Sequence, residues 1–113
     1  MQVASFFENL EFNDQHVAIT PMLESGFTKE IRIAFKEGQI MKEHKTGYPI
    51  TVMVLKGEIE FGLPEETVLL KSGDLIALEP NVVHSLKANE ESVVRLSLSK
   101  NDTVQRVNAV LNL

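Results

Sequence analysis

The chain has 113 residues, of which 43% are apolar and 24% charged, which is typical of one globular domain and excludes a disordered or fibrous protein. It contains no cysteine, which excludes disulfides, thiolate metal ligands and thiol nucleophiles. The 16 acidic and 11 basic residues give a net charge of −5, which disfavours binding to nucleic acid or to anionic membranes.

The N-terminal segment bears on the location of the protein and on one local structure. It has no basic region ahead of Glu8, unlike a secretory signal, and the chain has no apolar run of the about 20 residues that span a membrane. We therefore expect a cytoplasmic protein that contacts neither membranes nor nucleic acid. Ser5 and Glu8 have the spacing of a capping box, which predicts a short helical turn with Phe6 and Leu10 on its inner side.

The following part of the chain has the alternation of β-strands. Residues 28–36 alternate strictly between an apolar face and a second face that carries Arg32, which predicts a half-buried strand. Residues 51–55 and 58–62 flank Gly57, and glycine readily adopts the positive φ that a tight hairpin requires.

Four further segments are predicted strands: residues 67–70, 75–78, 82–88 and 93–99. Glycine, proline or asparagine separates them, and many short strands with such turns indicate an all-β sandwich or barrel. In the tail, residues 103–113, the apolar residues lie near helical spacing, whereas the β-branched content favours a strand. Both conformations stay open for the tail.

Two segments, residues 38–57 and 73–88, have glycine and histidine at the spacing of a known family. The first begins and ends with glycine and places His44 after five intervening residues, and the second begins with glycine and contains His84. The chain therefore resembles a small cupin. The resemblance implies a jelly-roll β-barrel that forms a single domain over residues 1–113.

The resemblance also implies a reduced metal site. In cupins, two histidines and a glutamate from the first segment and one histidine from the second usually bind one divalent metal. Here His44 and His84 keep two of the four positions, while Thr46 and Ile50 occupy the other two. The metal implied would be Zn, Ni, Fe or Mn, held by the two histidines. In the second segment Asn81, which follows a proline, suits the positive-φ position of a type II turn.

Strand parity predicts that both histidines point into the barrel. His44 and Thr46 are two residues apart and should share a strand face, and His84 should share the face of the apolar Leu86. A buried imidazole without a partner costs about 1 to 3 kcal/mol, so each ring should have one. The candidates are a local partner such as a backbone carbonyl, Thr46, Tyr48 or water, a metal, and a polar ligand.

A metal at this site would lack charge compensation. Two neutral imidazoles leave the charge of a divalent cation unbalanced in an apolar barrel, and His16 is the only other histidine. Water, a bound anion or an unrecognised third residue would have to complete such a site.

We expect a ligand pocket formed by His44, Thr46, Tyr48 and His84, with Arg95 as an anchor for a carboxylate. Tyr48 has an alternative role in packing on its turn, and Arg95 has one as a solvated side chain. The function predicted is binding of a small polar or anionic molecule, with no assigned reaction. The alternative is a metal-dependent cupin enzyme, of the dioxygenase or isomerase type, with a two-histidine metal site.

The resemblance also implies a partner. Cupin barrels commonly pair through sheet edges and an N-terminal segment, and the apolar residues of this segment are more than a short turn can bury: Val3, Phe6, Phe7, Leu10 and Phe12. We therefore expect a homodimer.

Overall fold

The computed structural model describes residues 1–100 of the chain. The tail, for which both a helix and a strand were predicted, lies outside the described residues. Within residues 1–100 the regular structure consists of nine β-strands, and no helix there is long and apolar enough to cross a membrane. The all-β prediction is confirmed.

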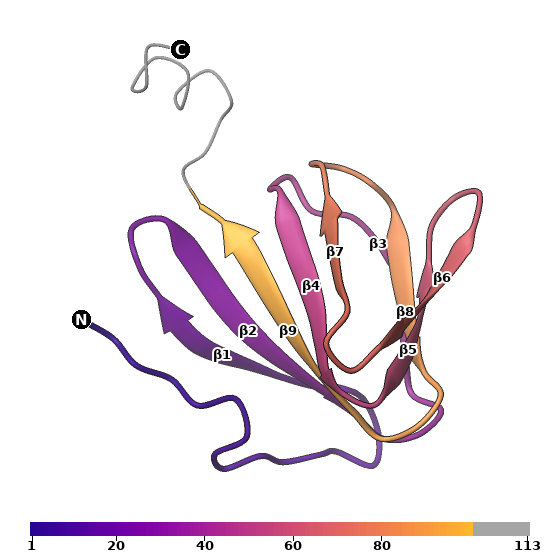
Figure 1. Cartoon of the computed structure of the whole chain (residues 1–113), viewed down its shortest axis with the longest axis horizontal. Helices are drawn as coiled ribbons and strands as arrows, with labels where there is room; N and C mark the ends of the chain where they lie inside the picture. The colour runs from indigo at the N-terminus through magenta and orange to yellow at the C-terminus, as the bar shows by residue number, and fades with distance from the viewer. Residues whose placement is uncertain (101–113) are drawn as a thin grey trace.

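The strands form two antiparallel sheets that face each other, as in a jelly roll (Figure 1). One sheet has five strands in the order β1-β2-β9-β4-β7, and the other has four in the order β3-β8-β5-β6. The strands are β1 (Ala18–Glu24), β2 (Thr28–Phe35), β3 (Ile40–His44), β4 (Ile50–Lys56), β5 (Glu58–Gly62), β6 (Thr67–Lys71), β7 (Leu75–Leu78), β8 (His84–Ala88) and β9 (Ser92–Ser99).

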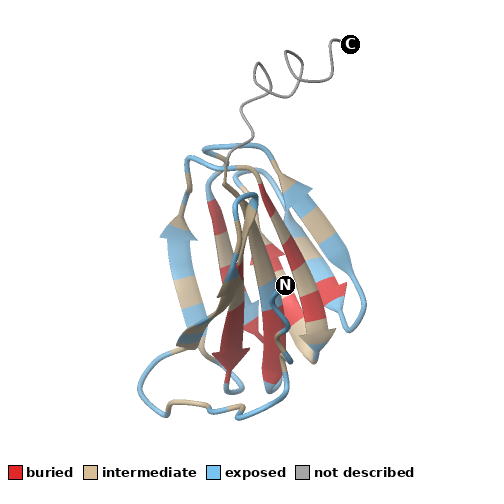
Figure 2. Ribbon diagram, turned by 90° about the vertical axis from the view of Figure 1, so that its left-hand side faces the viewer, coloured by how far each residue is buried: buried red, intermediate tan, exposed pale blue. Residues whose placement is uncertain are grey.

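The core lies between the two sheets and is built by alternation. Along β4 and β9, every second side chain points inward, so Val52, Val54 and Val94 are buried (Figure 2). The buried cluster draws on both sheets and comprises Ile33, Phe35, Ile50, Val52, Val54, Ile59, Phe61, Leu70, Leu86, Ala88 and Val94. The inner faces predicted from strand parity are therefore those that form the core.

The first strand was not predicted, because it contains Pro21. A proline cannot donate a ladder hydrogen bond, so it is tolerated in edge strands and at bulges. β1 is both: it is the outermost strand of the five-stranded sheet, and its pairing with β2 shifts register between Pro21 and Leu23.

The predicted hairpin at Gly57 is wrong. β4 pairs with β7 and β9, whereas β5 pairs with β6 and β8, so the chain passes from one sheet to the other at Gly57. Gly57 does have a positive φ of 95°. A Cβ there would lie 2.5 Å from the Glu91 carbonyl oxygen and 2.8 Å from the Ser92 Cα, so the position also requires glycine for close packing.

The N-terminal segment forms a turn at residues 6–9 rather than a helix, and the Glu8 amide donates to the Ser5 carbonyl at 3.2 Å. Arg32, on the outer face of β2, is only 4% exposed because this turn covers it. Its guanidinium donates to the carbonyls of Phe6, Glu8 and Asn9 at 2.9 to 3.2 Å. The second face of β2 is therefore covered by the N-terminal turn, which strand alternation alone did not predict.

Candidate functional site

The structure brings His44 and His84 together. His44 is the last residue of β3 and His84 the first of β8, and the two are direct partners across these neighbouring strands. Their ring centroids lie 4.3 Å apart, with the planes at 61°. His84 is 3% exposed and His44 is half-buried. The two histidines are thus brought together, and their role as ligand-binding residues stays a prediction.

An aromatic side chain packs against the ring of His84. Phe61 on β5 is fully buried, and its ring stacks on that of His84 with centroids 5.5 Å apart and planes within 5° of parallel. Since β5 is the neighbour of β8 in the four-stranded sheet, the imidazole lies against the core.

The backbone fixes which nitrogen of each ring carries hydrogen. Nδ1 of His44 lies 2.7 Å from the carbonyl oxygen of Lys42, and Nδ1 of His84 lies 2.9 Å from that of Val82. A carbonyl oxygen only accepts, so each Nδ1 must donate a hydrogen. In the neutral form of each ring, Nε2 therefore keeps a lone pair and acts as an acceptor.

Burial favours the neutral form of His84. Desolvation lowers the pKa of His84 below the ordinary histidine value. The hydrogen bond to the Val82 carbonyl opposes this effect, and the proximity of His44 adds to the lowering. At neutral pH the His84 ring is therefore an uncharged acceptor.

The residues present do not fit a resident divalent metal. The pattern of an Nδ1–H group donating to a carbonyl is the one that metal-bound histidines use, so His44 and His84 suit the chemistry in kind. However, residues 1–100 contain no group of three or more histidine, cysteine or acidic side chains that could hold a metal. Ile50, at the family's glutamate position, is a buried core residue. His16 is engaged elsewhere, through Nδ1, with the Val17 carbonyl.

Thr46 and Tyr48 lie in the turn that follows β3. The strand ends at His44, so the expectation that Thr46 shares its strand face is wrong. The Thr46 hydroxyl accepts from the Tyr48 amide at 3.0 Å and donates to the Tyr48 carbonyl at 3.2 Å. The Tyr48 side chain is 52% exposed. The contact of either residue with a ligand stays a prediction.

The turn is closed by Asn81. The backbone amide of Asn81 donates to the Thr46 carbonyl at 2.7 Å. The φ of Asn81, 67°, confirms the positive-φ conformation predicted for this residue. This bond ties the segment after β3 to the segment before β8, and so it helps to keep the two histidines next to each other.

Arg95 does not join the histidines, because it lies on the outer face of the five-stranded sheet. Its Nε donates to Glu30 Oε1 at 2.7 Å. The same carboxylate accepts from the hydroxyls of Ser97 and Thr28 at 2.6 and 2.7 Å. Burial raises the pKa of Glu30, but these three hydrogen bonds together bring that pKa below its ordinary value.

Arg95 thus binds a carboxylate of its own chain. Sequence reasoning missed Glu30, although the outward parity of both residues on strands of one sheet was the available signal. Arg95 and Glu30 line a hollow of about 510 Å³ on that outer face, separated from the histidine pair by the sheet. A ligand contact of Arg95 would have to be made there.

Comparison with known proteins bears on the fold and the family. The profile of the Cupin domain matches residues 31–99. No curated protein matches the sequence.

Several solved structures share the fold at low sequence identity. An RmlC-like cupin protein from Desulfovibrio desulfuricans is similar with a TM-score of 0.80 and 22% identity, covering 88% of this chain and 96% of that one. TT1209 from Thermus thermophilus has a TM-score of 0.80 and 20% identity, covering 88% and 97%. KdgF from a Halomonas species has a TM-score of 0.70 and 20% identity, with the same coverage.

The match to the Cupin domain spans more than half of the 113 residues, and it includes both histidines and every strand from β3 to β8. The protein belongs to the cupin family.

Proposed function

We propose that this cupin binds a small polar molecule beside His44 and His84, through hydrogen bonds that the ligand donates to the two Nε2 atoms. One observation carries the proposal: both Nδ1 atoms donate to backbone carbonyls, which leaves two neighbouring Nε2 acceptors. Among the described residues neither Nε2 has a hydrogen-bond partner. A ligand hydroxyl or a protonated acid supplies the donor that each Nε2 lacks.

The charge of the ligand follows from the protonation state of His84. A neutral His84 accepts hydrogen bonds and offers no positive charge, so hydroxylated molecules are favoured over anions at neutral pH. An anion would bind more tightly in acid, because a protonated imidazole donates from both nitrogens. The lowered pKa of His84 puts that change below the ordinary histidine range.

The test is a thermal-shift and NMR titration with uncharged polyols and with small carboxylic acids, above and below pH 6.5. We expect saturable binding that His44→Gln and His84→Gln each weaken by about tenfold, the equivalent of one hydrogen bond of about 1.4 kcal/mol. His16→Gln is the matched control and should change nothing, because His16 lies in an exposed loop. Binding that is equally strong in all three variants would overturn the proposal.

The alternative function, a metal-dependent cupin enzyme, is tested by elemental analysis of protein purified without an affinity tag. The Nδ1–H donation to carbonyls favours it, and the missing third ligand opposes it. We expect substoichiometric metal that His84→Ala does not change. One equivalent of metal that is lost in both His44→Ala and His84→Ala, but kept in His16→Ala, would establish the alternative instead.

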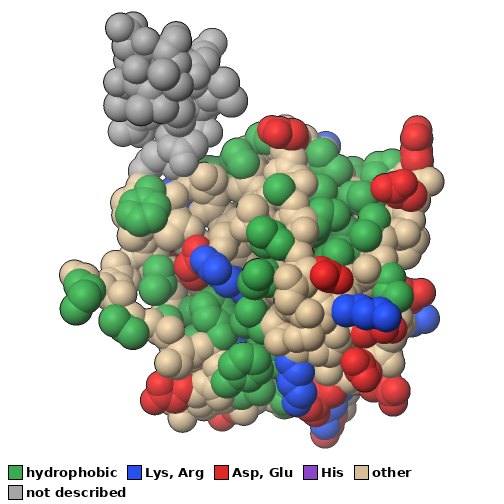
Figure 3. Space-filling view, in the orientation of Figure 1, with side chains coloured by type: hydrophobic (Ala, Val, Ile, Leu, Met, Phe, Trp, Pro, Cys, Tyr) green, Lys and Arg blue, Asp and Glu red, His purple; other side chains and the backbone are tan. Residues whose placement is uncertain are grey.

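We propose in addition that the protein is a homodimer. Several apolar side chains on and beside the five-stranded sheet are more than half exposed: Val3, Phe7, Phe27 and Leu75. Figure 3 shows hydrophobic side chains exposed on one face of the molecule. Light scattering should give twice the 12.7 kDa of the chain. A monomer mass would refute the dimer and leave the ligand proposal intact.

A further inference from the structure

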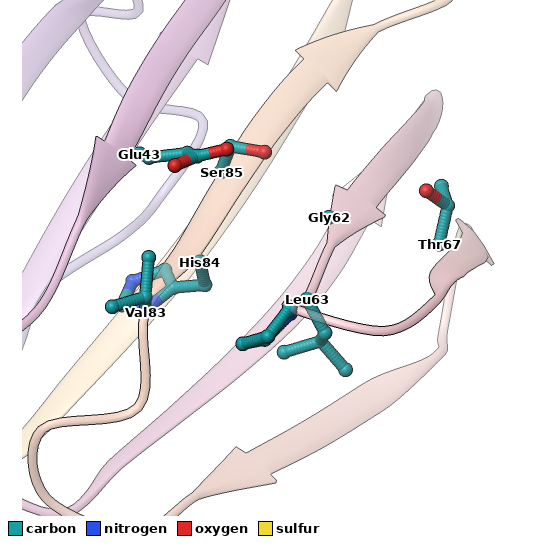
Figure 4. Close-up of a pocket in the computed structure, with 8 residues that line it drawn as sticks. Glu43, Gly62, Leu63, Thr67, Val83, His84 and Ser85 are labelled. Carbon is teal, nitrogen blue, oxygen red and sulfur yellow. The ribbon is translucent and has the colours of Figure 1, made fainter.

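The outer face of the four-stranded sheet carries a groove of about 460 Å³, on the other side of that sheet from the core (Figure 4). Its polar lining comes from Glu43, Thr67, Ser85 and His84, whose ring stacks on Phe61 of the core, and its apolar walls include Leu63 and Val83. Its volume lies within the range of sites that hold small molecules.

One residue from each of the four strands contributes to this groove. Gly62 of β5 is the direct partner of both Ser85 in β8 and Thr67 in β6. Glu43 precedes His44, whose partner His84 precedes Ser85, so β3 places Glu43 next to the same row. The side chains of Glu43, Thr67 and Ser85 lie next to inward residues along their strands, and so they face away from the core.

Gly62, in the middle of the row, makes room for a neighbouring side chain. A Cβ at this position would collide with the Ser85 hydroxyl, so the serine side chain lies over the glycine. Glycine inside a strand gives up packing and conformational restriction, and it often marks a place where a ligand approaches the backbone. Here the glycine lets the Ser85 hydroxyl lie across the strand towards β6, where Thr67 provides the next hydroxyl.

Three polar side chains of the groove, those of Glu43, Thr67 and Ser85, are not used by the fold. Among residues 1–100, neither the Ser85 and Thr67 hydroxyls nor the Glu43 carboxylate has a hydrogen-bond or ion-pair partner. The carboxylate of Glu30, on the outer face of the other sheet, shows the contrast, because three side chains donate to it. The groove therefore presents a carboxylate and two hydroxyls to the solvent, ready to exchange water for a ligand.

We propose that this groove is a second ligand site, on the opposite face of the sheet from the contact between the His44 and His84 rings, for a small neutral polyhydroxylated molecule of the monosaccharide class. Neighbouring ligand hydroxyls donate to the two oxygens of Glu43, and Ser85 and Thr67 donate to or accept from others. Leu63 and Val83 cover the C–H faces of the ligand. An anion is disfavoured, because Glu43 is the charged residue of the lining and the chain carries a net charge of −5.

The test is an amide-resolved NMR titration with uncharged methyl glycosides of glucose, galactose, mannose and xylose. We expect saturable shift changes at Gly62, Thr67 and Ser85 with at least one glycoside. Glu43→Gln and Ser85→Ala should each weaken the binding by about tenfold, since each removes a hydrogen bond. Glu65→Gln, the same change on a residue outside the groove, should leave the affinity unchanged.

Three outcomes would overturn the proposal. They are the absence of saturable shifts in the groove with all four glycosides, binding that survives in both Glu43→Gln and Ser85→Ala, and tighter binding of an anion such as acetate at the same amides. His44→Gln distinguishes this site from the interior one, because it should weaken binding at the histidine pair by about tenfold and leave the groove affinity unchanged.

Discussion

At the scale of single residues, the buried side chains of His84 and Arg32 differ in how their polar atoms are satisfied. His84 is neutral, stacked on Phe61 and bonded through Nδ1. Arg32 keeps its charge under the N-terminal turn, where three carbonyls accept from it while its Nε has no partner. The stability of the protein in acid therefore depends on His84, and the N-terminal turn depends on Arg32.

The lowered pKa of His84 predicts that the folded state loses stability in acid. Below pH 6.5 the His84 ring binds a proton in the unfolded chain. In the folded protein the same ring binds it only at lower pH, because its pKa is lower there. The contribution of His84 is therefore complete above pH 6.5 and is lost as the pH falls below that value. Urea melts across this range should show a weaker decline in His84→Gln than in His16→Gln. Equal declines in the two variants would contradict the assignment.

The carbonyl contacts of Arg32 predict that the N-terminal turn depends on this side chain. Arg32→Lys keeps the charge but offers one nitrogen to three acceptors, so unfolding free energy should fall by about 1 to 3 kcal/mol. Hydrogen exchange at residues 6–9 should rise at the same time. Arg95→Lys is the control, because it alters the contact with Glu30 and leaves the hydrogen bonds between Arg32 and the turn in place. Unchanged exchange in Arg32→Lys would show that other contacts hold the turn.

At the scale of elements, the faces of the strands were predictable and their partners were not. Alternation is a local pattern, and it located the inward residues of β2, β4 and β9. Whether β4 and β5 form a hairpin or enter different sheets depends on their pairing with β9 and β8, which are distant in sequence. The same reason explains why β1 was missed, since its proline is tolerated only because that strand is at an edge.

The crossing between sheets predicts different costs for two glycine substitutions. Gly57→Ala adds a Cβ against the backbone of Glu91 and Ser92 at a positive φ, so it should cost about 3 kcal/mol or more. Gly38 has a similar φ of 86° but open space around it, so Gly38→Ala should cost about 1 to 2 kcal/mol. Chemical denaturation measures both. Equal losses would mean that close packing at Gly57 contributes nothing.

At the scale of the whole molecule, the two sheets place different chemistry on different sides. The space between them holds the histidine pair, the outer face of the five-stranded sheet holds Glu30 and Arg95, and that of the four-stranded sheet holds the open groove.

The candidate site was partly predictable. The pairing of His44 and His84 followed from motif and parity, whereas Thr46 was misplaced because a turn began one residue after His44. Arg95 was expected to anchor a ligand of this pocket, although its parity, opposite to that of Val94 and Leu96, was the signal for the other face of the sheet, and its partner Glu30 required the sheet order. Local pattern therefore gives the direction of a side chain, and the pairing of distant strands decides which side chains meet.

The most direct test of the central claim is the tautomeric state of the two imidazoles, read from long-range proton–nitrogen correlation spectra well above the ordinary histidine pKa of about 6.5. The account predicts that His44 and His84 both carry hydrogen on Nδ1 and none on Nε2, and that a bound ligand shifts both Nε2 resonances. A hydrogen on Nε2 of either ring in the folded protein would contradict it, because the pair would then lack the two acceptors on which the proposed function rests.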